Sequence, residues 1–320
     1  MQVKSFFTIF LLILKVDINA QTAPFNYEQK MISSGKNFPD FNLRRDSIDR
    51  LIVLLHEGKK PSKIQKELGW TTEKFIDQTA FLESKGFLKK TGKTYRPTCM
   101  VINIKDGNTL YKYAEKIAQA ISDSLTLDRK FFTNEYKLTN LSKQMPFDSV
   151  SFLILSNVLL DNWQINNVED DFLKKPRALR HGKNYYYAFM QKNPSGKSES
   201  FGIYGNQFFR DFLVYGNNRN HIKAAEVSKY AEKLPLVDSI DNSLFYLWAD
   251  LFKSKLIKIL NEHKGYIQSV YKKTGYAKEV TFEEFFIWWY HFIYTRATNI
   301  LFERNLIIIP AEGNFFYRLK

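Results

Sequence analysis

An apolar run near the C-terminal end of the chain places the strongest constraint on its fold. Residues 285–294 have the sequence FFIWWYHFIY, so a helix through them is apolar on almost every side. Such a helix must lie inside a core rather than on a surface. Thr281 and Glu284 have the spacing of a capping box, which predicts that the helix begins there. The run is too short to span a membrane, and we expect His291 to be a hydrogen-bonded core residue rather than a metal ligand.

The composition supports a fold made mainly of helices. Hydrophobic residues form 44% of the 320 residues, which is enough for large cores, and the 14 glycines are few for a turn-rich β protein. Apolar residues recur at helical spacing over 110–125 and 244–260. Strand-like segments flank turn residues within 184–204 and 306–317 and predict two β-hairpins. We therefore expect a mainly α protein with small β-hairpins, an α+β fold.

A compact helical segment follows the N-terminal region. Residues 47–97 predict three short helices and then a β-hairpin. The segments 61–71 (PSKIQKELGWT) and 82–88 (LESKGFL) resemble the winged helix-turn-helix superfamily. This resemblance implies a third helix that enters the DNA major groove and a hairpin that contacts phosphates. The residues that would contact nucleic acid are Lys85, Lys89, Lys90, Lys93 and Arg96. The third helix also offers Glu73 and Asp77, whose charges repel phosphates, so nucleic acid binding is not favoured.

The first twenty residues have the three-part layout of a secretory signal peptide. Lys4 precedes the apolar run 5–14, and Ala20 offers a small residue at the cleavage position. We predict cleavage near Ala20 and an exported chain, periplasmic or secreted, with no transmembrane segment in the mature protein. The alternative is an uncleaved N-terminal segment of a cytosolic protein.

These patterns predict the organisation of the chain. After the signal peptide, residues 21–46 form an irregular leader. Residues 47–132 form the winged-helix-like domain with a following amphipathic helix, and the polar stretch 133–146 separates the two domains. Residues 147–320 form a helical α+β domain that carries hairpins, and its closing helix and hairpin suggest a second winged-helix-like unit.

Sequence motifs of catalysis are absent from the chain. It contains no signature of a phosphate-binding loop, a serine hydrolase or a zinc protease. The five histidines are scattered without a pair four residues apart, and the single cysteine, Cys99, lies in a stretch typical of a buried strand. We therefore predict no catalytic residue, no metal and no cofactor.

Aromatic and polar side chains gather in the middle of the chain. Flat apolar faces beside a few oriented donors are typical of a site for a polar ligand, here an anionic or sugar-like group. The predicted site residues are Trp163, Arg177, Arg180, His181, Tyr185 and Tyr204. The alternative is a cluster at the edge of the core whose polar atoms bond to one another.

The sequence therefore favours an exported, non-catalytic binding or interaction protein of the cell envelope. Its net charge of +14 suits a protein partner or an anionic envelope component. One alternative is a winged-helix nucleic-acid-binding regulator, which requires that the N-terminus is retained. A second alternative is a hydrolase or transferase centred near His181.

Overall fold

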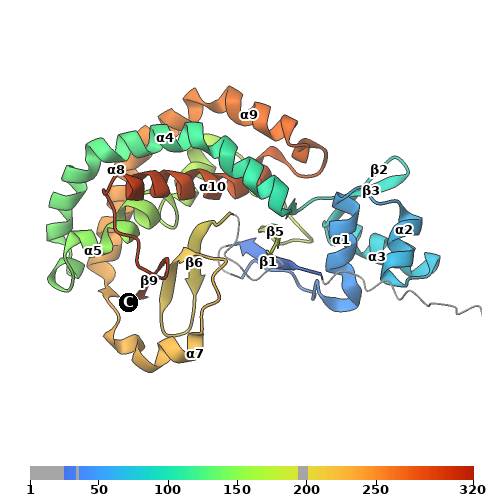
Figure 1. Ribbon diagram of the computed structural model, residues 1–320, viewed down its shortest axis with the longest axis horizontal. Helices are drawn as coiled ribbons and strands as arrows, with labels where there is room; N and C mark the ends of the chain where they lie inside the picture. The colour runs from blue at the N-terminus through green and yellow to red at the C-terminus, as the bar shows by residue number, and fades with distance from the viewer. Residues whose placement is uncertain (1–24, 34–35, 194–200) are drawn as a thin grey trace, which may run out of the picture.

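The computed structural model describes residues 25–33, 36–193 and 201–320, and these form a small N-terminal unit and a larger helical body (Figure 1). A three-stranded sheet lies between the two parts, and a four-stranded sheet lies below the helices of the body. The predicted class, mainly helical with small sheets, is confirmed. Among the described residues, no helix combines the length and the apolar character that crossing a membrane requires.

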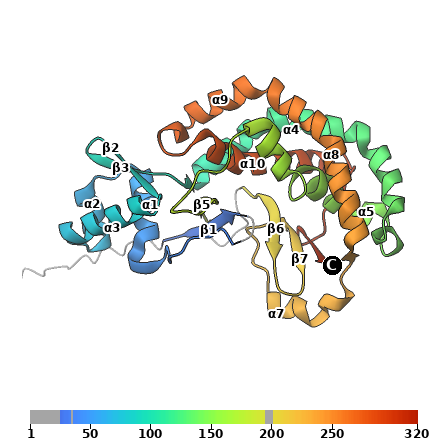
Figure 2. The same ribbon diagram turned by 180° about the vertical axis from the view of Figure 1, so that it is seen from behind.

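The apolar run forms the centre of the body. Helix α10 (Phe282–Glu303) is buried from Glu284 to Thr295, and it lies alongside α4 (Ile104–Glu135) in both ribbon views (Figures 1 and 2). The indole of Trp289 donates to the backbone oxygen of Leu110, a 2.9 Å bond that joins the two helices. The remaining helices of the body are α5 (Phe147–Phe152), α6 (Ile165–Asn167), α7 (Ala224–Val227), α8 (Ser239–Glu262) and α9 (Lys264–Lys273).

Helix α4 runs further than the sequence pattern predicted. It was expected to end before the polar stretch 133–146, but it continues to Glu135 and covers 32 residues. Phe132 and Tyr136 extend the buried stripe of Ile121 and Leu125 by further helical turns, so the same face stays in the core. The polar residues between them lie on the outer face.

The N-terminal unit contains the elements predicted for it. Its helices are α1 (Ile48–His56), α2 (Pro61–Leu68) and α3 (Thr72–Ser84), and its antiparallel hairpin joins β2 (Leu88–Thr91) to β3 (Thr94–Pro97). Thr71 caps α3 by accepting a 3.1 Å bond from the Lys74 amide, and Gly69 ends α2 with a positive φ of 66°. The likeness of this unit to winged-helix proteins remains a prediction.

The sheet between the two parts corrects two expectations. Strand β5 (Tyr186–Gln191) lies in its centre, antiparallel to β1 (Tyr27–Ile32) and parallel to β4 (Met100–Ile102). Part of the predicted irregular leader is therefore a regular strand. The predicted hairpin within 184–204 is wrong, because both edges of β5 are already paired with strands from earlier in the chain. Cys99 is buried beside β4, as predicted.

The four-stranded sheet corrects a third expectation. Its order is β6 (Tyr204–Phe208), β7 (Leu213–Asn217), β9 (Asn314–Leu319) and β8 (Leu236–Val237). Strand β9 pairs with β7 and β8, so the predicted C-terminal hairpin within 306–317 is wrong. The close approach of β7 and β9 requires glycine at position 216, since a Cβ there would meet the backbone oxygen of Gly313 at 2.2 Å.

A buried ion pair joins α10 to the central sheet. The guanidinium of Arg180 contacts the carboxylate of Glu284, and both side chains are almost fully buried. Arg180 also donates to the backbone oxygens of Thr98 and Tyr185, while Glu284 accepts a 3.0 Å bond from the amide of Tyr187. Because its carboxylate is used in this way, Glu284 does not complete the predicted capping box. Only the other half forms, in which Thr281 accepts from the Glu284 amide.

We expect Glu284→Gln to lower the free energy of unfolding by about 3–5 kcal/mol, because it leaves the Arg180 charge buried without its counter-charge. The matched control is Glu283→Gln, which removes a carboxylate that contacts the exposed Lys175 at 3.4 Å and should change stability by less than about 1 kcal/mol. Urea denaturation measures both values. Equal effects of the two substitutions would show that the buried pair is not a major source of stability.

Candidate ligand-binding site

The structure does not gather the six predicted site residues around one cavity. Arg180 and Tyr185 are buried in the core, where the guanidinium carbon lies 5.7 Å from the centre of the tyrosine ring. The charge of Arg180 is paired with Glu284. His181 has a positive φ of 47° and an exposed side chain. These neighbours in sequence therefore have different surroundings, and their role in binding remains a prediction.

The other three predicted residues lie in the helical body. Trp163 is buried and donates from its indole to Asn242 at 2.9 Å. The hydroxyl of Tyr204 donates to Asn299 at 2.7 Å. Both side chains are thus satisfied inside the protein, as the core-edge alternative describes. Arg177 differs, because it lines a cavity.

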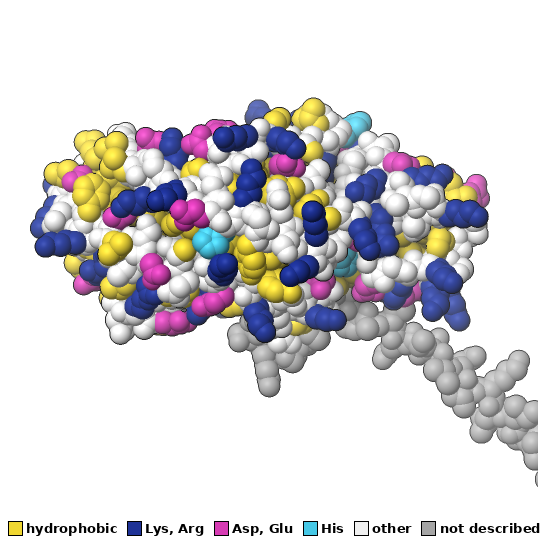
Figure 3. Space-filling model, turned by 90° about the horizontal axis from the view of Figure 1, so that it is seen from above, with side chains coloured by type: hydrophobic (Ala, Val, Ile, Leu, Met, Phe, Trp, Pro, Cys, Tyr) yellow, Lys and Arg dark blue, Asp and Glu magenta, His cyan; other side chains and the backbone are white. Residues whose placement is uncertain are grey.

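The basic residues of the β2–β3 hairpin have two kinds of surroundings. Lys85 pairs with Asp40 at 2.8 Å, and Arg96 lies 3.8 Å from Glu279. The side chains of Lys89, Lys90 and Lys93 are exposed, and within the described parts of the chain they form no ion pair. On the face drawn in Figure 3, basic side chains are spread along the molecule with acidic ones between them. Nucleic acid binding by these residues therefore stays a prediction.

A polar cavity of about 280 Å³ lies where the end of β1, the turn after residue 160, β6, α8 and α10 meet. Asp161, Asn206 and His291 are among its lining residues, and Asp161 and His291 are 5% and 6% exposed. The exposed rings of Phe208 and Tyr246 also line it. A concave site with polar groups deep inside and aromatic rings near the surface has the features of a ligand pocket.

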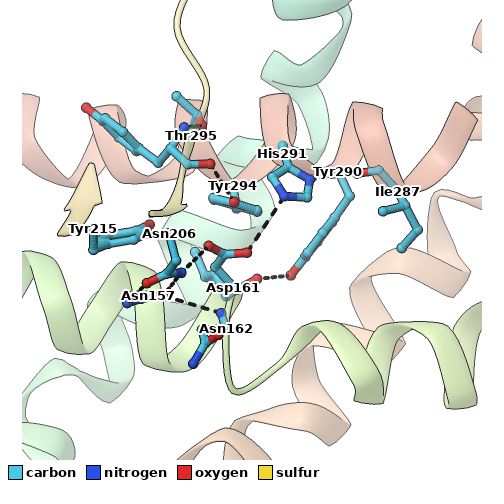
Figure 4. A network of polar contacts seen from close by, with 12 residues as sticks. Asn157, Asp161, Asn162, Asn206, Tyr215, Ile287, Tyr290, His291, Tyr294 and Thr295 are labelled. Atoms are coloured by element: carbon cyan, nitrogen blue, oxygen red, sulfur yellow. Dashed lines mark hydrogen bonds and ion pairs between the residues drawn. The ribbon is translucent and has the colours of Figure 1, made fainter. Parts of the chain in front are cut away.

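Two stretches of π-helix flank the turn that carries Asp161. They cover Leu153–Val158 and Val168–Leu173, and such widened turns are frequent at functional sites. The side chain of Asn157, in the first stretch, exchanges amide hydrogen bonds of 2.9 and 2.8 Å with Asn206 on β6. Asn206 also donates to Asp161 at 3.0 Å. The chain is thus held so that the aspartate faces the strand and α10 (Figure 4).

The protonation of His291 follows from its position on α10. Its Nδ1 lies 2.8 Å from the backbone oxygen of Ile287, one turn earlier in the helix. A carbonyl only accepts hydrogen bonds, so Nδ1 carries the proton. The other nitrogen, Nε2, is an acceptor, and it lies 3.8 Å from Oδ1 of Asp161. Burial lowers the pKa of His291 to about 4, which keeps the ring neutral at pH 7.

Asp161 is the second member of the pair. Burial raises its pKa to about 7, against a smaller lowering by hydrogen bonds to Tyr294 and Asn206. The Tyr294 hydroxyl donates its single proton to the Tyr204 backbone oxygen at 2.7 Å. Below about pH 7, Asp161 and His291 therefore share one titratable proton, and it resides on the aspartate.

Arg177, the one arginine among the described lining residues, is neutralised. Glu169 accepts two bonds from Arg177, at 2.7 and 2.8 Å, in a two-pronged pair. In contrast, Oδ1 of Asn218 is buried in the lining without a hydrogen-bond partner among the described residues. The cavity thus offers amide and carboxyl groups rather than free charge, which suits a small polar ligand.

Sequence reasoning predicted that His291 is a hydrogen-bonded core residue, and this is confirmed, but it missed the cavity. Asp161 and Asn206 are 45 residues apart along the chain, and no local pattern relates them. The one available signal was Asp161 itself, a carboxyl group directly after the apolar run 150–160.

We expect the stability of the protein to depend on pH in opposite directions when one or the other member of the Asp161–His291 pair is replaced. In Asp161→Asn, His291 has a folded pKa of about 4 against an ordinary 6.5, so stability is lost as pH falls through that interval. In His291→Gln, Asp161 has a folded pKa of about 7 against 3.8, so stability is lost as pH rises between those values. Each slope reaches up to about 1.4 kcal/mol per pH unit.

In the wild type the contributions of the two groups largely cancel between pH 4 and 6.5, because the folded and unfolded pair each bind one proton. Thermal unfolding from pH 4 to 8 measures the slopes, with the exposed Asp170→Asn as the control. Slopes of the same sign in the two variants would contradict the shared proton.

Comparisons of the chain with protein-family models, with curated proteins and with solved structures found no match. Within the described residues, no group of three or more His, Cys, Asp or Glu side chains could hold a metal ion.

Proposed function

We propose that the protein is a non-catalytic binding protein that holds a small polar ligand in the Asp161–His291 cavity. The observation that carries this proposal is the buried pair of polar groups among the lining residues of the cavity, whose Nε2 and Oδ1 atoms lie 3.8 Å apart without a direct hydrogen bond. A ligand in the cavity that bonds to both atoms would bridge them.

Binding is favoured over catalysis by the other residues of the lining. Ser33 is the one serine, threonine, cysteine or lysine among the described lining residues, and its hydroxyl donates to the backbone oxygen of Asn37. A nucleophile needs a base within hydrogen-bond reach, and the structure gives this serine a carbonyl partner instead. Among the described lining residues, the acid–base pair therefore has no activated nucleophile beside it.

We also propose that the chain is exported and acts in the cell envelope. This part of the proposal rests on the N-terminal sequence, in which a basic residue, an apolar run and Ala20 follow one another. Residues 1–24 lie outside the described residues.

The ligand proposal predicts binding that depends on the wall of the cavity. In a thermal-shift screen of sugars, amino acids, polyamines and carboxylic acids, at least one compound should stabilise the wild type. Tyr246→Ala should weaken binding of that compound by about 2- to 12-fold, the equivalent of 0.5–1.5 kcal/mol. Tyr230→Ala is the control, because Tyr230 is similarly exposed but does not line the cavity. Equal loss in both variants would contradict the site.

Export predicts a mature chain that begins at Gln21. Fractionation of cells that express the full sequence, followed by N-terminal sequencing, should find this end outside the cytosol. An intact Met1 in the cytosol would contradict export and would favour the winged-helix regulator. In that case Lys89, Lys90 and Lys93 become the residues to replace in a DNA-binding assay.

A further inference from the structure

We propose that the ligand of this cavity is a neutral polyhydroxylated molecule of about monosaccharide size, bound with one hydroxyl group between Asp161 and His291. This inference rests on the proposed function and assigns its ligand class. It follows from the geometry of the pair, the neutrality of its surroundings and the chemistry of the cavity wall.

The geometry of the pair suits a hydroxyl group. Nε2 of His291 accepts and the carboxyl of Asp161 donates, and the two atoms lie 3.8 Å apart. An oxygen atom placed off the line between them can reach both with bonds of about 2.8 Å. A hydroxyl group is at once a donor and an acceptor, so it satisfies both partners. A carboxylate ligand would accept only and would leave Nε2 without a donor.

Among the described residues, the groups around the pair carry no free charge. From α10, the hydroxyl of Tyr290 donates to the Leu160 backbone oxygen at 2.8 Å, and Tyr294 donates to the Tyr204 oxygen. Burial raises the pKa values of both tyrosines, as it does for Tyr215 on β7, so all three are neutral.

On β9, the Tyr317 hydroxyl lies 3.3 Å from the amide oxygen of Asn206, and burial likewise keeps it neutral. The remaining charged group of the lining, Arg177, is paired with Glu169. An anionic ligand would therefore find no free cation among the described lining residues. Its negative charge would also have to lie next to the carboxyl group of Asp161.

The wall of the cavity offers further partners for hydroxyl groups. The residues Asn162 and Asn166 add amides that both donate and accept. Phe208 and Tyr246, which are 66% and 56% exposed, supply flat faces for the C–H side of a sugar ring. The volume of about 280 Å³ lies just below the usual range of ligand pockets and limits the ligand to a small molecule.

The main competing ligand class, an amine, has the opposite pH dependence. An ammonium group would be stabilised by ionised Asp161, so its binding would strengthen as pH rises through about 7. A hydroxyl ligand needs the protonated carboxyl as a donor, so its binding would weaken over the same interval. The sign of the pH dependence therefore separates the two classes.

The experiment uses isothermal titration of the purified chain with glucose, galactose, mannose and N-acetylglucosamine, and with lysine and 1,4-diaminobutane, at pH 6 and pH 8. We expect at least one sugar to bind at pH 6 and to bind about tenfold more weakly at pH 8, the factor for one pH unit above a pKa of about 7. The control Asp170→Asn should behave as the wild type does.

Two substitutions of Asp161 test the donor directly. Asp161→Asn keeps a donor that does not titrate, so sugar binding should persist within about threefold at both pH values. Asp161→Ala removes the donor and should weaken binding at pH 6 about tenfold. Circular dichroism of each variant confirms that it is folded.

The other outcomes each overturn one claim. A sugar whose affinity does not change with pH, or that binds Asp161→Asn as weakly as Asp161→Ala, overturns the hydroxyl between the pair. An amine or carboxylic acid that binds through Tyr246, when no sugar does, overturns the ligand class and leaves the proposed binding function intact. If no compound of the titration or the screen binds, the proposed function and this inference both fail.

Discussion

The structure depends on where the polar side chains of a fully buried helix find their partners. Helix α10 has no exposed face over most of its length, and several of its polar side chains bond to the elements packed around it. Glu284 binds the central sheet through Arg180, Trp289 binds α4, and the Thr295 hydroxyl accepts from the amide of Tyr204, the first residue of β6. The apolar surface of α10 drives burial, while these few bonds determine which neighbour lies at which turn.

The parts of the fold that local chemistry decides were predictable. The apolar run that becomes α10 and the Thr71 cap of α3 each carry their signal within a few residues, and the predicted α+β class is confirmed. Strand pairing was not predictable, because β5 pairs with β1 and β4, which come from distant parts of the chain. Since a hairpin is the default for neighbouring strand signals, the sequence favoured the wrong partner. The cavity was missed for the same reason, since Asp161, Asn206 and His291 come together only in the folded chain.

The cavity shows how one proton reduces the cost of burying two titratable groups. A buried carboxylate beside a buried imidazolium would place two charges in a medium of low polarity, whereas the neutral acid and neutral base place none. The hydrogen bond from His291 to the Ile287 oxygen decides which ring nitrogen keeps its hydrogen, and thus which one faces Asp161. The tautomer is set by the helix backbone and not by the cavity, so the acceptor is preorganised before any ligand arrives.

Strand β1 also has a consequence for aggregation of the protein. It forms one border of the three-stranded sheet, and its outer row of backbone groups resembles the template on which strands from other molecules add. Glu28 and Lys30 bring charge to this border, where their side chains lie 3.4 Å apart, and Glu28 also pairs with Arg219. Charged residues of this kind disfavour intermolecular strand addition. A chain that lost β1 would instead present the border of β5, whose residues Tyr186 to Met190 are buried and apolar, and would be prone to aggregate.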